Sequence, residues 1–106
     1  MAKLQTPIRF LTATAEYVAD EIIGEGGVGR VYAATSDESQ QVAVKLLNHE
    51  RATSKQRRRF RNELAFLQRT NHPNVVSAID AGVYAGPGWT APFYVMHRFD
   101  GPLPTL

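Results

Sequence analysis

Short apolar runs rich in β-branched residues alternate with glycine-rich or polar stretches along most of the chain. Three such runs come early, at residues 17–23, 31–34 and 42–47, and two more come late, at 75–84 and 93–96. Runs of this length and composition between turn-forming residues are typical of β-strands. Gly86-Pro87-Gly88 marks a turn between the last two. The pattern therefore predicts five strands.

A different period governs the segment between the third and fourth runs. Apolar residues recur there at spacings of four and three, which places them on one face of a helix: Phe60, Leu64 and Leu67. Thr53 or Ser54 is suited to cap the helix N-terminus, because its hydroxyl can accept a bond from an otherwise unpaired backbone N–H. Pro73 cannot continue a helix and restricts the residue before it, so we expect the helix to end near Asn71.

The order of elements is thus three strands, one helix and two strands. Short connections at the first two junctions favour antiparallel pairing, which needs no crossover helix. We expect an α+β fold, a five-stranded antiparallel sheet with one main helix. Residues 1–16 show no clear period and are interpreted as an N-terminal extension, with the folded domain at residues 17–106.

Composition places the chain among ordinary globular domains. Its 106 residues are 43% hydrophobic and 21% charged, enough for one modest core. There is no cysteine, which excludes disulfides and cysteine-based zinc sites. No apolar run approaches the roughly 20 residues that span a bilayer, and the first ten residues lack the apolar stretch of a secretion signal. We therefore expect a cytoplasmic protein without a membrane segment.

The net charge of +2 arises largely from one cluster in the predicted helix: Lys55, Arg57, Arg58, Arg59 and Arg61. A basic cluster can bind nucleic acid or phosphate. Such runs are more often solvated helix faces, and no aromatic stacking platform accompanies this one. We interpret the cluster as a solvated face and expect no nucleic-acid partner.

The first candidate for chemistry is the glycine cluster Gly24-Glu25-Gly26-Gly27-Val28-Gly29-Arg30-Val31, which matches GxGxxGxV. Glycine has no side chain to block close approach, so such a loop can bring backbone N–H groups against phosphate oxygens. Taken alone the motif is weak. A dinucleotide-binding fold would need a helix directly after the glycines and an acidic residue about 20 positions on, but strand-like residues follow here and position 45 is a lysine. A Walker loop is excluded because no Gly-Lys-Ser/Thr follows.

Two charged residues occupy positions where the pattern predicts apolar surroundings. Lys45 ends the run Val42-Ala43-Val44, and Glu63 lies on the apolar side of the predicted helix. An edge-strand lysine and a surface glutamate are ordinary explanations for each one separately. An unpaired buried charge is costly, however, so each residue needs a partner. The lysine and the glutamate can satisfy each other, and both follow a glycine loop.

This combination resembles the N-terminal lobe of eukaryotic-type (Hanks-type) Ser/Thr protein kinases. In that family the glycine loop covers the ATP phosphates, and a strand lysine contacts them while pairing with a glutamate of the C helix. The resemblance covers residues 17–106 and assigns the loop to Gly24, Gly26, Gly29 and Val31, the lysine to Lys45 and its partner to Glu63. The segment His72-Pro73-Asn74-Val75-Val76 is similar to the family's link between the C helix and the fourth strand.

The resemblance also implies where adenine would lie. Ile23 and Val31 would cover the ring and Ala43 would leave room for it. Met96 would be the gatekeeper, and the backbone of His97 and Phe99 would supply the hinge hydrogen bonds. His97 stands where the family often has glutamate, a departure of little consequence because the hinge uses main-chain groups.

Two family motifs are missing from the 106 residues, which end about where the large lobe would begin. His97-Arg98-Phe99-Asp100 is not the catalytic His-Arg-Asp, and Asp80-Ala81-Gly82 precedes the hinge and is not the magnesium motif. The resemblance implies ATP as cofactor, Mg²⁺ bound by the missing lobe, and protein hydroxyls as substrates. We expect this chain alone to be inactive in transfer and to self-associate through the surface meant for the large lobe. The alternative is a stand-alone or pseudokinase-like lobe acting as a nucleotide- or protein-binding regulatory module.

Overall fold

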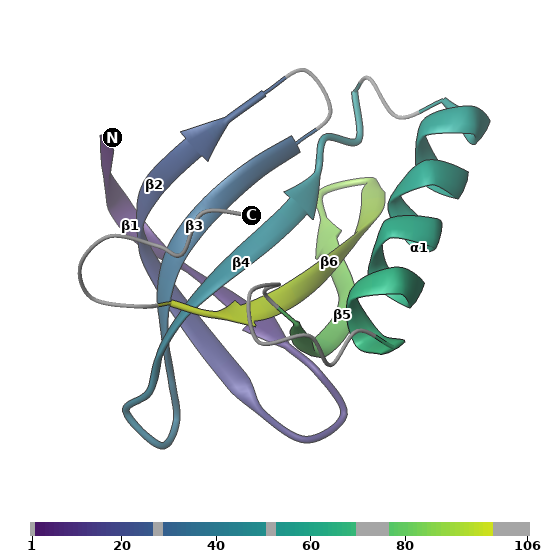
Figure 1. Ribbon diagram of the computed structural model, residues 1–106. Coiled ribbons are helices and arrows are strands. Elements are labelled where there is room, and N and C mark those ends of the chain that lie inside the picture. Colours follow the sequence, from purple (N-terminus) through teal and green to yellow (C-terminus); the bar gives the residue numbers. More distant parts are fainter. Residues whose placement is uncertain (1, 27–28, 51–52, 70–76, 99–106) are drawn as a thin grey trace.

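The computed structural model describes residues 2–26, 29–50, 53–69 and 77–98 and shows a curled antiparallel sheet with one helix beside it (Figure 1). The elements follow in the order β1 (Ala2–Leu11), β2 (Glu16–Glu25), β3 (Gly29–Ser36), β4 (Gln41–Leu47), α1 (Ser54–Arg69), β5 (Ala78–Gly86) and β6 (Trp89–His97). The predicted α+β class and all five predicted strands are present.

The predicted number of strands is wrong, because the sheet has six. The additional strand is β1, which lies within the segment interpreted as an extension and pairs antiparallel with β2, Phe10 opposite Tyr17. Seven of its ten residues are exposed, Leu4 and Ile8 are partly buried, and only Phe10 is fully buried. The ring of Phe10 lies 5.0–5.5 Å from those of Tyr32, Tyr84 and Phe93. Because only one of its ten residues is fully buried, β1 shows no clear hydrophobic period in the sequence. That residue, Phe10, is nevertheless central to the core.

The strand order β1-β2-β3-β4-β6-β5 places β1 and β5 at the two edges of the sheet. The sheet curls until these edges meet, and the turn after β1 lies beside the start of β5 (Figure 1). Thr12 in that turn donates a 2.7 Å hydrogen bond to the Asp80 carboxylate on β5. Tyr17 of β2 donates a second 2.7 Å bond to the same oxygen. The closed end of the sheet is therefore held by one carboxylate with two hydroxyl donors.

Alternation along β4 separates the two faces of the sheet. Val44 pairs with Tyr32 and Val95, and these side chains belong to the aromatic core around Phe10. Lys45 pairs with Val31 and Tyr94 on the other face, from which its side chain reaches Glu63 of α1. Two consecutive residues of β4 therefore lie on opposite faces, Val44 in the core and Lys45 in the candidate site.

Helix α1 begins with the predicted cap. The Thr53 hydroxyl accepts from the Gln56 backbone N–H at 3.2 Å, and the Gln56 side chain accepts from the Thr53 N–H at 3.0 Å, which is a capping box. Phe60 is the one fully buried residue of the helix, with Leu64 and Leu67 partly buried against the core. The predicted face is confirmed, whereas the predicted stop at Pro73 lies outside the described residues. Among the described segments, no helix is long and apolar enough to cross a membrane.

Candidate functional site

The structure brings Lys45 and Glu63 together across the gap between β4 and α1. Lys45 Nζ lies 2.8 Å from Glu63 Oε1, within both ion-pair and hydrogen-bond range. The side chains are 29% and 44% exposed, so the pair is not deeply buried as the pattern suggested. Ion pairs with this much solvent contact add little to stability. The pair is therefore accessible to solvent and is not a major source of the fold's stability.

Tyr94 completes the cluster, and sequence reasoning did not single it out. Its hydroxyl donates to the same Glu63 Oε1 that Lys45 contacts. Its ring lies 5.9 Å from Lys45 Nζ and 5.2 Å from the ring of Phe60. A signal existed in the sequence, because a tyrosine buried in a strand needs a partner for its hydroxyl. Nothing in the sequence pointed to Glu63 as that partner until β6 was paired with β4.

Charge interactions in the cluster favour an ionised glutamate and a neutral tyrosine. Partial burial by itself would raise the pKa of Glu63, but the hydrogen bonds from Lys45 and Tyr94 and the positive charge of Lys45 together lower it below its usual value. Burial raises the pKa of Tyr94 strongly, and its hydrogen bond to the negative Glu63 raises that pKa further. The cluster thus holds one negative carboxylate between a cation and a neutral donor.

The glycine cluster lies at the end of the β2–β3 hairpin, closed by a 2.9 Å bond from the Gly26 N–H to the Gly29 carbonyl. The three described glycines of the motif differ in how much space a side chain would have at each position. A Cβ on Gly29 would lie 2.3 Å from the Leu46 carbonyl oxygen, so packing against β4 excludes a side chain there. A Cβ on Gly26 would meet nothing within 4 Å, and one on Gly24 would make ordinary contact with Val31 at 3.5 Å. The space around Gly26 is therefore open, and residues 27 and 28 lie outside the described part.

Three of the residues assigned to the adenine pocket share the face of Lys45. Val31 pairs with Lys45 itself, Ala43 lies two positions earlier on β4, and Met96 pairs with Ala43. Ile23 lies at an irregularity in the β2–β3 pairing, between Ile22 opposite Tyr32 and Gly24 opposite Val31. His97 is the last residue of β6 and pairs with Val42. Phe99 lies outside the described residues.

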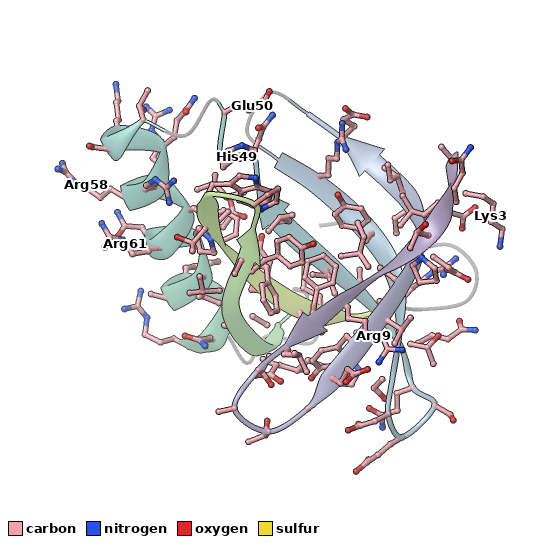
Figure 2. The ribbon with its side chains drawn as sticks, turned by 180° about the vertical axis from the view of Figure 1, so that it is seen from behind. Lys3, Arg9, His49, Glu50, Arg58 and Arg61 are labelled. Atoms are coloured by element: carbon pink, nitrogen blue, oxygen red, sulfur yellow. The ribbon has the colours of Figure 1, made fainter. Side chains whose placement is uncertain are left out.

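Other features lie apart from this cluster. A cavity of about 250 Å³ opens at the end of the sheet near His49, whose ring stacks on Trp89 at 3.8 Å, and none of the predicted site residues lines it. Arg58 and Arg61 point away from the sheet on the outer side of α1 (Figure 2). Within the described segments, no group of three or more histidine or acidic side chains is placed to hold a metal ion.

Comparison with known proteins explains why these elements occur together. Residues 17–86 match the family described as "Protein kinase domain". The chain belongs to the protein kinase family. The matched range includes β2 to β5 and α1, and with them the glycine hairpin, Lys45 and Glu63. It leaves β1 and Tyr94 outside.

Two bacterial relatives cover most of this kinase lobe. It is 37% identical over 87 residues, 80% of the chain, to the probable serine/threonine-protein kinase PknB of Corynebacterium glutamicum. It is 35% identical over 91 residues, 84% of the chain, to the serine/threonine-protein kinase PksC of Streptomyces coelicolor. A plant relative, the receptor-like serine/threonine-protein kinase ALE2 of Arabidopsis thaliana, is 40% identical over 63% of the chain. The matches span 14%, 16% and 9% of these proteins, so the lobe corresponds to a small part of each.

Proposed function

We propose that this kinase lobe binds ATP between the glycine hairpin and the Lys45 face of the sheet. In a protein that also carries a catalytic lobe, it would position the γ-phosphate for transfer to serine or threonine hydroxyls of a protein substrate. The supporting observation is the 2.8 Å contact between Lys45 and Glu63, on the face that also holds Val31, Ala43 and Met96. The names of the relatives support serine/threonine specificity.

The residues present fit the nucleotide by their chemistry. The Lys45 ammonium supplies a positive charge for phosphate oxygens, and the Glu63 carboxylate, whose pKa is lowered, orients that ammonium through the 2.8 Å contact. The open space at Gly26 lets backbone approach a phosphate, and the small Ala43 leaves room for a flat ring. Bound ATP would supply the phosphoryl group itself. The 106 residues contain neither His-Arg-Asp nor Asp-Phe-Gly, so we propose that this chain alone does not transfer phosphate and that Mg²⁺ is held elsewhere.

Titration with a fluorescent ATP analogue tests the binding step. Lys45→Met should weaken binding to the chain. In a longer kinase it should slow transfer by about 10²–10³-fold, a loss of the size caused by removing one preorganised donor to a charged transition state. Lys3→Met is the matched control, because that lysine is exposed on β1, where it lies 4.0 Å from the Asp20 carboxylate and far from the proposed site. Equal affinity and equal transfer in the wild type and Lys45→Met would contradict the proposal. Binding without transfer in the longer protein would favour the regulatory module.

We also propose that the isolated lobe self-associates. Among the residues that the structure describes, four large apolar side chains are between 41% and 62% exposed: Leu11, Phe66, Ile79 and Val83. Exposed apolar surface favours association between copies. Light scattering should show an average mass that rises with concentration, and a constant monomer mass up to millimolar concentration would contradict this.

A further inference from the structure

We propose that Tyr94 is a positioning residue that holds Glu63, and with it helix α1, in the geometry needed to orient Lys45. The inference rests on the proposed function, because it concerns the lysine–glutamate pair of that site. Tyr94 comes from β6 and lies outside the residues matched to the kinase family. Its hydroxyl donates to Glu63 Oε1, so one carboxylate oxygen is shared by a donor from β6 and a donor from β4.

The anchoring of α1 makes this hydroxyl important. Phe60 is the single fully buried residue of the helix, and it packs on the Tyr94 ring at 5.2 Å. Glu63 lies one turn further along, with its side chain 44% exposed. A half-exposed glutamate held only by a flexible lysine would sample many rotamers, because both side chains are long. A second donor fixed to the sheet restricts that motion.

The hydroxyl and the ring of Tyr94 have separable effects. The ring fills volume in the core, being 2% exposed, and lies 5.9 Å from Lys45 Nζ. A phenylalanine would keep this packing and the contact with the cation. Only the hydrogen bond to Glu63 would be lost. Replacement of Tyr94 by phenylalanine therefore isolates the positioning effect from the packing effect.

A matched control exists in the same sheet. Tyr17 is also buried, at 5% exposed, and also donates its hydroxyl to a carboxylate, that of Asp80 at 2.7 Å. Asp80 lies on the edge strand β5. Its hydrogen-bond partners in the described part of the chain are Thr12, Tyr17 and the Ala81 N–H, none of which belongs to the proposed site. Tyr17→Phe should thus reproduce the loss of one tyrosine–carboxylate bond without touching Glu63.

The experiment compares wild type, Tyr94→Phe and Tyr17→Phe by two measurements on the full 106-residue chain. A titration of the side-chain carboxyl carbons by NMR should show the pKa of Glu63 moving upward in Tyr94→Phe and unchanged in Tyr17→Phe. Affinity for the fluorescent ATP analogue should fall by roughly three- to tenfold in Tyr94→Phe, the effect of one hydrogen bond of ordinary net strength. It should be unchanged in Tyr17→Phe, even though both variants unfold at lower urea concentration.

Four outcomes decide between these possibilities. An upward pKa shift together with weaker binding in Tyr94→Phe alone supports the positioning role. An unchanged Glu63 pKa and unchanged affinity in Tyr94→Phe, while Lys45→Met still weakens binding, overturns the role of Tyr94 and leaves the proposed function standing. Equal losses of affinity in both tyrosine variants also overturn it, because a general loss of stability would then explain the effect. Full affinity in Lys45→Met would instead overturn the proposed function.

Discussion

Two buried tyrosines in this small sheet each donate to a carboxylate, but the two carboxylates have different partners. Tyr17 shares Asp80 with the hydroxyl of Thr12, so that cluster has no cation among its described bonds. Tyr94 shares Glu63 with the ammonium of Lys45. The first cluster joins the two edges of one sheet, whereas the second joins the sheet to a helix that has one fully buried residue.

The two hydrogen bonds are expected to have different effects: the one at Asp80 holds strands together, whereas the one at Glu63 also orients a charged side chain. The hydroxyls at Asp80 hold strands that the backbone ladder and the aromatic core already fix. The cluster at Glu63 places a charged amine at a surface where 29% of its side chain meets solvent, which is the amine that we propose contacts phosphate. Both bonds contribute to stability, and the bond at Glu63 also carries the proposed positioning of Lys45.

The largest expected effect on stability comes from Asp80→Ala. It removes the acceptor of two hydroxyls, one of them on the buried Tyr17, and an unsatisfied buried donor costs about 1–3 kcal/mol. We expect a loss of about 2–3 kcal/mol in the free energy of unfolding, measured by urea denaturation. Asp20→Ala is the control, because its 4.0 Å ion pair with Lys3 is largely exposed and should contribute almost nothing. A loss no larger than that of the control would show that Asp80 does not hold the edges together.

Glu63→Gln should have the opposite profile, with a small effect on stability and a clear one on function. The amide can still accept a hydrogen bond but carries no charge for Lys45, so transfer by the longer kinase should fall by about tenfold, less than in Lys45→Met. Glu16→Gln is its control, since Glu16 forms a 3.1 Å pair with Arg9 on the far strands. If both variants transfer phosphate at the wild-type rate, the Glu63 cluster has no positioning role.

The smallest expected effect is a loss of stability at alkaline pH, to which both tyrosine–carboxylate clusters should contribute. Burial, hydrogen bonding and the nearby negative carboxylate raise the pKa of Tyr17 and of Tyr94 above the ordinary value of 10.0. The unfolded chain releases these protons near pH 10 while the folded chain retains them, so the stability they contribute is complete below pH 10 and falls as the pH rises above it. Each retained proton changes the free energy of unfolding by at most about 1.4 kcal/mol per pH unit.

Urea unfolding at several values between pH 9 and pH 11 measures this slope. Tyr17→Phe and Tyr94→Phe should each flatten it, because each removes one proton that the folded state retains. A slope unchanged in both variants would mean that neither tyrosine resists ionisation. A slope flattened in only one would show that the two clusters differ in burial as well as in partners.

Local patterns in the sequence were enough to predict most of the strands, the helix, and two charged residues of the site. The β-branched runs, the Thr53 cap and the Phe60 face correspond to β2 to β6 and α1, because each depends on neighbours within a few positions. Lys45 and Glu63 stood out because a charge in an apolar setting requires a partner. The structure placed them in contact at 2.8 Å.

Only the tertiary structure decided the place of β1 and of Tyr94. The importance of Phe10 comes from three rings contributed by β3, β5 and β6, and no pattern within β1 reports them. The role of Tyr94 depends on β6 pairing with β4 and on α1 packing beside the sheet, with contacts between residues 18 to 49 positions apart. Periodicity describes which face a residue occupies, but the partner across a sheet or under a helix is set by how distant segments pack.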